Sequence, residues 1–283
     1  MLIQANAKLN LTLDVLSKRP DGYHDMRMIM QSIALADDLT VSPLEWDELR
    51  VKTNLHFLPN NEKNLAAQAA LRYWEARGTE PRGLDITIQK RIPVCAGMAG
   101  GSSDAAAVLR ALNQMDPHPL DPVALARIGE RVGSDVPYCV LGGTALAEGR
   151  GEELTPLPPL PRCWVVVCKP DFPISTPALF QRIDSIRLRR RPDTKGAIEA
   201  LKAGDLAGVA RRMYNVFEDA LTKRQLERVA EIKNELIRCG ALGASMSGTG
   251  PTAFGLFERE EEAREAYDRL REINRETFFT QTV

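Results

Sequence analysis

The sequence predicts an α+β protein with two domains. Apolar residues in strand-like and helix-like spacing alternate along the whole chain, which is typical of this class. Four prolines stand within residues 155–161; proline stiffens a segment and lacks the N–H that a sheet ladder needs, so we expect a domain connection there rather than a strand. At 283 residues the chain is long enough for two cores. We therefore expect domains over 1–157 and 158–283.

The first expected domain opens with strict alternation of apolar and polar residues. Apolar side chains take every second position from Ile3 to Val15, which predicts a long strand with one buried face. A turn at 19–22 separates it from a second strand that carries three methionines. The other expected elements here are strands near 39–41, 84–89 and 137–146 and helices at 64–77, 105–113 and 121–132.

The second expected domain starts with an apolar strand at 163–168, where a tryptophan and three valines favour extended backbone. A long amphipathic helix is expected at 224–239, followed by two short apolar segments that flank a Ser/Gly/Thr turn within 241–257. The other expected elements here are helices at 177–183, 195–203, 206–213 and 260–273 and a last strand near 278–282.

Composition narrows the class of partner. Lys and Arg number 37 against 38 Asp and Glu, whereas a nucleic-acid-binding protein usually shows a basic excess, so no nucleic-acid partner is expected. The five cysteines form no C-x-x-C pair and indicate neither a disulfide framework nor a zinc site. No apolar run is long enough for a membrane span and no export signal is visible. We expect a cytoplasmic protein with a small-molecule substrate and no membrane partner, as a monomer or weak homodimer.

The most informative segment is the glycine-rich stretch 93–104, which runs into an alanine-rich helix. Its three glycines allow positive φ and close approach to a ligand, and Ser102 and Ser103 offer N-cap hydroxyls to the helix. A helix N-terminus attracts anions, phosphate above all. The segment lacks the lysine of a P-loop and the glycine spacing of the dinucleotide-binding fingerprint. We predict a phosphate-binding loop; the alternative is a loop that only caps a packed helix.

Two charged residues are candidates for chemistry. Lys8 lies between Asn6 and Asn10 on the polar side of the first expected strand, where it either faces a site or is a solvated cation on an exposed face. Asp135 lies in a short break between a helix and an expected strand. It is either a site carboxylate or a turn aspartate bonded to its own backbone, and nothing local separates these interpretations.

Three further features also have two interpretations. Residues 247–251 form either a second anion-binding nest or a hairpin turn. The Tyr23-His24 pair is either ordinary surface or a pair that stacks on or bonds to a base. The five cysteines are interpreted as small buried hydrophobes, and Cys95, inside the glycine loop, is the one that a thiol reagent should affect.

Three blocks together resemble the GHMP kinase superfamily: the lysine-bearing first strand, residues 93–107 and residues 245–251. The resemblance implies a two-domain GHMP kinase fold, with a mixed N-terminal sheet and helices followed by a C-terminal α+β domain. It also implies transfer of the ATP γ-phosphoryl group to a small-molecule hydroxyl, with Mg²⁺. Within the superfamily, segments 5–11, 19–24 and 133–137 resemble the kinases whose acceptor joins a cytidine nucleotide to an erythritol.

The resemblance also implies roles for single residues. Lys8 and Asp135 would form the catalytic pair, and Ala99 stands where the family often has glycine. The residues implied at the nucleotide are Asn64, Leu65 and Lys90 near the adenine, and Pro93, Ala96, Gly97, Met98, Ala99, Gly100, Gly101, Ser102 and Ser103 around the phosphates. Those implied at the acceptor are Asn10, Thr176 and Asp135 at the erythritol end and Tyr23, His24 and Phe180 at the cytosine ring. The metal ligand stays open between Ser103 and Asp104.

Two alternative functions stand beside this one. Another GHMP kinase would act on mevalonate, homoserine or a sugar, but those substrates carry no base for the Tyr23-His24 pair to stack on. A non-catalytic sensor of the same fold would bind ATP or a small ligand, and the presence of both Lys8 and Asp135 argues against it.

Overall fold

The computed structural model describes residues 1–188 and 190–283. These residues form two compact units, each built from separate stretches of the chain. The proline-rich segment 155–161 lies inside the second unit, and a domain boundary near residue 157 stays a prediction. The first unit comprises Met1–Ala7, Leu35–Ile92 and Ala99–Gly142, and the second comprises Lys8–Ala34, Pro93–Met98 and Gly143–Val283.

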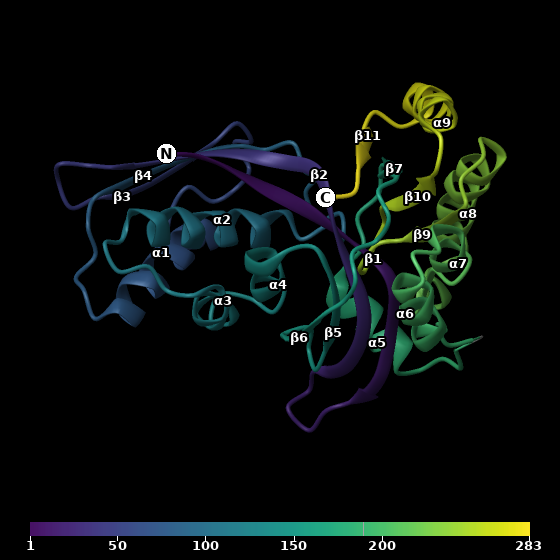
Figure 1. Cartoon of the computed structure of the whole chain (residues 1–283), viewed down its shortest axis with the longest axis horizontal. Coiled ribbons are helices and arrows are strands. Elements are labelled where there is room, and N and C mark those ends of the chain that lie inside the picture. Colours follow the sequence, from purple (N-terminus) through teal and green to yellow (C-terminus); the bar gives the residue numbers. More distant parts are fainter. Residues whose placement is uncertain (189) are drawn as a thin grey trace. The chain divides into compact units, whose positions relative to one another are not determined.

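The first unit consists of a sheet with helices on one face (Figure 1). Strand β3 (Leu49–Thr53) runs parallel to β4 (Leu84–Gln89), and β4 pairs antiparallel with the last part of β2 (His24–Pro43). The helices of this unit are α1 (Leu65–Arg77), α2 (Gly100–Met115), α3 (Pro122–Glu130) and α4 (Val136–Leu141).

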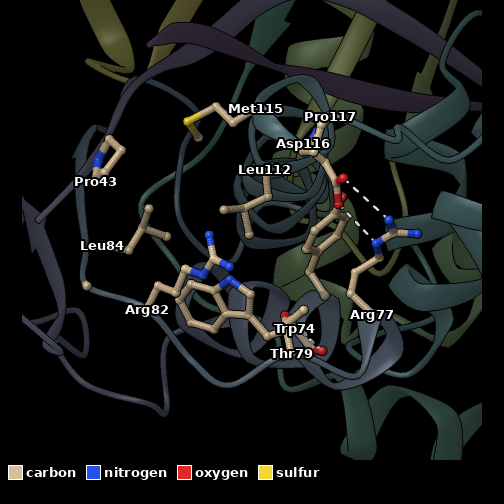
Figure 2. A pocket seen from close by; sticks show the side chains of 12 residues that line it. Pro43, Trp74, Arg77, Thr79, Arg82, Leu84, Leu112, Met115, Asp116 and Pro117 are labelled. Atoms are coloured by element: carbon tan, nitrogen blue, oxygen red, sulfur yellow. Dashed lines mark hydrogen bonds and ion pairs between the residues drawn. The ribbon is translucent and has the colours of Figure 1, made fainter.

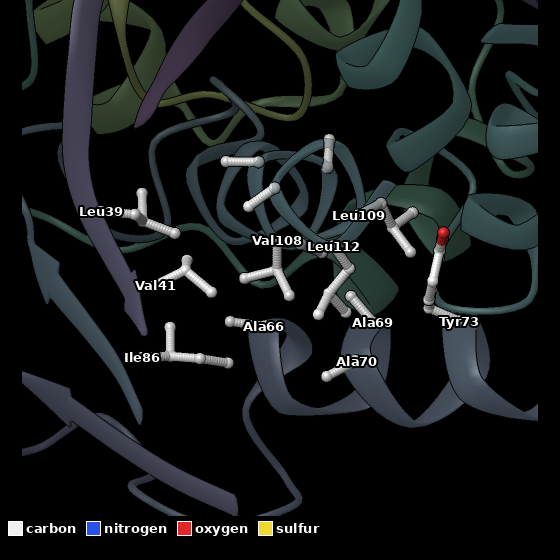
Figure 3. Close-up of a cluster of buried hydrophobic side chains, with 14 of the residues drawn as sticks. Leu39, Val41, Ala66, Ala69, Ala70, Tyr73, Ile86, Val108, Leu109 and Leu112 are labelled. Atoms are coloured by element: carbon white, nitrogen blue, oxygen red, sulfur yellow. The ribbon is translucent and has the colours of Figure 1, made fainter. Parts of the chain in front are cut away.

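The core of the first unit lies between this sheet and helices α1 and α2 (Figure 3). Leu39 and Ile86 from the sheet face Val108 of α2 across the core. The two helices meet through alanines, which let their axes approach closely because the side chains at the contact are short. The buried alanines are Ala66, Ala67, Ala69 and Ala70 of α1 and Ala105, Ala106, Ala107 and Ala111 of α2.

The strands of the second unit belong to two sheets. One is the seven-stranded mixed sheet that also contains β3 and β4. In it, β1 (Leu2–Lys18) pairs with β2 and runs parallel to β8 (Tyr214–Asn215), while β5 (Thr144–Glu148) is antiparallel to both β2 and β6 (Glu153–Pro156). The other sheet is antiparallel and has the order β11-β7-β10-β9, formed by β7 (Trp164–Cys168), β9 (Gly243–Met246), β10 (Ala253–Phe257) and β11 (Thr277–Gln281).

Helices cover the antiparallel sheet. Helices α8 (Lys223–Arg238) and α9 (Glu260–Ile273) pack against its strands, as their amphipathic sequence pattern predicts. The other helical segments of this unit are α5 (Thr176–Ile183), α6 (Thr194–Lys202), α7 (Leu206–Ala210) and the 3₁₀ turn Val216–Ala220. The mixed sheet pairing and the α+β character expected from the sequence are confirmed. No helix in the described residues is both long and apolar enough to span a bilayer.

Three expectations about the elements were wrong. The expected strand at 137–146 is in fact helix α4 followed by β5, because Pro137 suits a first helical turn and Gly142, with φ of 70°, ends the helix. The two strands expected between residues 24 and 43 are one continuous strand, β2. Pro156 does join a sheet: it pairs with Ala145 at the end of β6, where a missing N–H is tolerated.

Candidate active site

The residues implied at the site are divided between the two units. The first half of the glycine loop, Pro93–Met98, belongs to the second unit together with Lys8, and the stretch from Ala99 onward belongs to the first unit together with Asp135.

In the second unit, the first half of the glycine loop is fixed by its neighbours. The backbone N–H of Lys8 donates to the carbonyl of Met98 at 3.2 Å, and the Ser247 hydroxyl donates to the carbonyl of Gly97 at 2.9 Å. Gly97 has φ of 72°, and a Cβ there would lie 2.1 Å from the Ser247 carbonyl oxygen. Only glycine satisfies both the backbone conformation and the close approach.

Lys8 is buried rather than solvated. The residue is 4% exposed, and its Nζ donates to Asn10 Oδ1 at 2.7 Å. The same oxygen accepts from the N–H of Gly248 at 2.9 Å. The alternative of a solvated cation on an exposed sheet face is therefore wrong, and a buried ammonium lies in the strand residue that also bonds the glycine loop.

Residues 247–251 form a hairpin turn between β9 and β10, which pair antiparallel. Ser247 N–H donates to the Thr252 carbonyl at 2.9 Å. The turn is also held from β8, because the Asn215 side-chain amide donates to the carbonyls of Met246 at 2.8 Å and Gly248 at 2.7 Å. Asn215 was not predicted from the sequence, because it carries no motif and its bonds to the turn join residues more than 30 positions apart.

Of the residues implied at the acceptor, His24 and Phe180 are in contact, whereas Tyr23 and Thr176 contact other residues. His24 is 7% exposed and its ring stacks on Phe180 with centroids 4.7 Å apart, so the interpretation of this histidine as ordinary surface is wrong. Tyr23 is 58% exposed and its ring faces the guanidinium of Arg150 at 5.3 Å. Thr176 and Thr249 share a hydrogen bond of 2.9 Å between their hydroxyls.

Asp184, which sequence analysis missed, orients the histidine ring. Its Oδ1 lies 2.6 Å from His24 Nε2 and its Oδ2 accepts from Lys18 Nζ at 2.7 Å. These hydrogen bonds, first the one from Lys18 and then the one from His24, hold the pKa of the Asp184 carboxyl below its usual range. An ionised carboxylate only accepts, so Nε2 carries the proton and Nδ1 of a neutral ring is left as an acceptor.

In the first unit, helix α2 begins differently from the expectation. Ala99 is the N-cap residue, with φ of 58°, and Gly100 and Gly101 already lie in the first turn rather than at positive φ. Ser102 and Ser103 therefore do not cap the helix. The Ser103 hydroxyl instead donates to the carbonyl of Asn6 at 2.7 Å, which ties the helix start to β1.

The residues implied near the adenine have other contacts within the first unit. Asn64 is the N-cap of α1: its Oδ1 accepts from Ala66 N–H at 3.0 Å. The Leu65 side chain lies 3.3 Å from where a Gly101 Cβ would be. The Lys90 ammonium lies between two buried carboxylates, Asp37 and Asp104, at 2.5 and 2.7 Å.

Asp135 stands at the N-cap position of α4, with φ of −83°. Its carboxylate makes no capping hydrogen bond to the helix, and the choice between a site carboxylate and a turn aspartate bonded to its own backbone stays a prediction. Asp135 is half-buried.

Neither open metal candidate fits a resident Mg²⁺. Ser103 is 1% exposed and donates to a carbonyl, and the Asp104 carboxylate is 5% exposed and bound to Lys90. Within 1–188 and 190–283, no group of three or more His, Cys, Asp or Glu side chains could hold a metal ion.

A cavity of about 400 Å³ lies elsewhere in the first unit (Figure 2). Trp74, Leu112 and Met115 form part of its apolar wall, and Arg77 reaches across to Asp116 at 2.9 Å. None of the residues implied at the nucleotide or the acceptor lines this cavity.

Comparison with known proteins gives consistent results. The family descriptions "GHMP kinases N terminal domain" and "GHMP kinases C terminal" match residues 64–143 and 197–276. The chain is 44% identical over 280 residues to 4-diphosphocytidyl-2-C-methyl-D-erythritol kinase of Alkaliphilus metalliredigens, covering 99% of this chain and 96% of that one.

Solved structures extend the likeness. A crystal structure of 4-(cytidine 5'-diphospho)-2C-methyl-D-erythritol kinase is 34% identical, with a TM-score of 0.82 over 100% of this chain and 99% of that one. The homoserine kinase of Cytophaga hutchinsonii, 19% identical, has a TM-score of 0.75 over 100% of this chain and 93% of that one, which is a likeness of fold alone. The expected two-domain fold, with a mixed N-terminal sheet and helices and an antiparallel C-terminal sheet, is confirmed.

Proposed function

The chain belongs to the GHMP kinase family, and on that premise we propose that it transfers the γ-phosphoryl group of ATP to the 2-hydroxyl of 4-diphosphocytidyl-2-C-methyl-D-erythritol. The observation that carries this proposal is the 44% identity to a kinase of that name over almost the full length of both chains. The reaction belongs to the non-mevalonate route to isoprenoid precursors. ATP use follows from the family, and Mg²⁺ is part of the proposal.

The proposed phosphate contact is the glycine loop with the N-terminus of α2. The unpaired N–H groups at a helix start and the positive end of its dipole attract phosphate oxygens. Gly97 supports this role because the chain passes there without a side chain, held between Lys8 and Ser247. Phosphoryl transfer depends mainly on positioning and charge stabilisation, which a fixed loop supplies.

Lys8 and Asp135 are the proposed catalytic pair. Asp135 accepts or orients the proton of the acceptor hydroxyl, while the oxygen attacks the γ-phosphorus and the bond to the β-γ bridging oxygen breaks. Lys8 steadies the negative charge that develops on the attacking oxygen. Burial of Lys8 supports this role, because a buried ammonium acts on nearby charge with less screening than a solvated one.

The proposed cytosine contact consists of Tyr23, His24 and Phe180, with Asn10 and Thr176 toward the erythritol end. Cytosine offers an exocyclic amino group, which matches the acceptor that Asp184 leaves at His24 Nδ1. The aromatic rings of Tyr23 and Phe180 offer stacking surface. A substrate without a base would make no use of these contacts.

Mg²⁺ would neutralise developing charge on the phosphates when bound with ATP. Because Ser103 and Asp104 do not fit a resident ion, we assign no protein ligand to the metal and route no step through it.

The direct test is ADP release from Mg-ATP with the cytidyl acceptor, run in parallel with mevalonate, homoserine and galactose. We expect turnover with the cytidyl acceptor alone. Turnover with another acceptor would keep the kinase and remove the cytosine pocket. Folded protein that binds ATP and turns over none of them would indicate a sensor.

A further inference from the structure

A buried charge cluster joins β2, the end of β4 and the first turns of α2. Lys90 Nζ donates to Asp37 Oδ2 at 2.5 Å and to Asp104 Oδ2 at 2.7 Å, and the three side chains are 4%, 0% and 5% exposed. The resemblance implies only that Lys90 is near the adenine. Its ammonium is instead turned into the protein, beneath the helix that follows the glycine loop.

Two of the three members, Asp37 and Lys90, are held by hydrogen bonds that involve backbone. Asp37 Oδ1 accepts from the N–H groups of Arg91 at 2.5 Å and Ile92 at 2.8 Å, the last residues before the glycine loop. The backbone of Lys90 is bonded on both sides to the Asn54 amide, at 2.8 and 3.2 Å. The Lys90 ammonium is therefore held in place by its backbone and by Asp37, and it in turn holds the Asp104 carboxyl.

The cluster reaches the first residue of α2. A Cβ added to Gly100 would lie 3.4 Å from Lys90 Nζ and 3.1 Å from Ile92 Cγ2. The start of α2 therefore lies within van der Waals contact of the ammonium, and Ile92 is the neighbour that leaves least room for a side chain at Gly100. The positive charge sits at the end of the helix that already carries the positive end of the dipole.

The buried charge cluster is not expected to stabilise the fold, so its presence calls for another explanation. Two carboxylates face one ammonium, and Asp104 Oδ1 is buried without a hydrogen-bond partner in the described residues. A buried ion pair is often no more stabilising than apolar side chains of the same size. A helix start that is held in place has a use, however, if an anion binds to the N–H groups on its outside.

We propose that Lys90 is a positioning residue for the nucleotide phosphates: held by Asp37, it fixes the first turn of α2 through Asp104 and so keeps the N–H groups of that turn in place for the phosphates. This inference rests on the proposed function, because it takes the loop to bind ATP. A positioning role differs from an adenine contact, because it predicts that loss of Lys90 weakens the binding of the phosphates and leaves the binding of the adenine base unchanged.

The test is equilibrium binding of Mg-ADP, Mg-ATP and adenosine to Lys90→Met, measured by calorimetry below the melting temperature of the variant. We expect the Kd of ADP and ATP to rise about tenfold, the size of a helix-terminus interaction with a phosphate, with adenosine affinity and the KM of the acceptor unchanged. The Lys90→Met/Asp104→Asn double variant, which avoids an added unpaired charge, should give the same rise if the single variant does not fold.

The matched control lies at the other end of α2. Arg77 pairs with Asp116, the C-cap residue of that helix, at 2.9 Å, so Arg77→Met should lower the melting temperature and leave nucleotide affinity unchanged. If Lys90→Met also lowers the melting temperature and leaves nucleotide affinity unchanged, the proposal is overturned. It is also overturned if Lys90→Met weakens adenosine binding as much as ADP and ATP binding. Wild-type protein that binds no ATP would instead contradict the proposed function.

Discussion

Gly97→Ala tests whether the glycine loop is held where the chemistry needs it. The residue has φ of 72°, which costs an alanine about 1–2 kcal/mol. Its Cβ would lie 2.1 Å from the Ser247 carbonyl oxygen, and real Cβ contacts are never under 3.0 Å, so loop and hairpin turn must separate by about 0.9 Å. Overpacking of this kind costs about 1–3 kcal/mol more. We expect the free energy of unfolding to fall by about 2–5 kcal/mol.

A shift of that size also matters for catalysis. Misplacing a reacting group by about 1 Å costs roughly 100-fold in rate, so kcat/KM for ATP should fall by about that factor. The control is Gly78→Ala, at φ of 62° with nothing within 4 Å of the added Cβ. It should lose only about 1–2 kcal/mol for the backbone strain and keep its activity. Urea unfolding and ADP release measure both quantities, and equal behaviour of the two variants would refute the reasoning.

Three other predictions follow from single residues. Asp135→Asn should lose at least about 100-fold in kcat with an unchanged melting temperature; near wild-type turnover would remove Asp135 from catalysis. Iodoacetamide should alkylate Cys95 first, because it is the exposed cysteine while burial raises the pKa of the Cys168 thiol to about 11; ATP should slow the inactivation, and a Cys95→Ser variant inactivated at the same rate would contradict this. Burial raises the pKa of Asp104 to about 8 from 3.8, so the folded state binds the extra proton and the free energy of unfolding should fall as the pH rises from about 4 to about 8. Asp104→Asn should remove that part of the slope in urea unfolding across this range, and an identical slope in both proteins would show that Asp104 titrates normally.

Local patterns were sufficient where one segment determines its own structure. The alternation from Ile3 to Val15 predicted the strand β1, but the expectation of a single buried face was wrong, because the polar side chains from Lys8 to Asp14 are buried as well. The pattern at 224–239 predicted α8 almost to the residue. The local patterns failed where the backbone conformation of one residue determines where a helix begins. Ala99 takes φ of 58° and starts α2 before the serines that looked like its caps, and Pro137 turns an apolar run into a short helix. A non-glycine residue at positive φ leaves no signal in the sequence.

The site residues divide in the same way. Lys8, Asp135 and the glycine loop are predicted at the site because the segments that resemble the family contain them, and their roles stay predictions. Asp184 and Asp37 were not predicted, because their roles depend on partners 160 and 53 residues away. Side chains that act by supporting another residue become visible only once the fold brings their partners together.

The central claim is that this chain phosphorylates the 2-hydroxyl of the cytidyl acceptor, and the product's proton-coupled phosphorus NMR spectrum tests it most directly. The 2-hydroxyl is tertiary, so a phosphate there has no proton on the attached carbon, and we predict one new monoester signal without three-bond proton splitting beside an intact diphosphate. A triplet would place the phosphate on a primary hydroxyl and a doublet on a secondary one, and either would contradict the claim, as would the absence of any new signal.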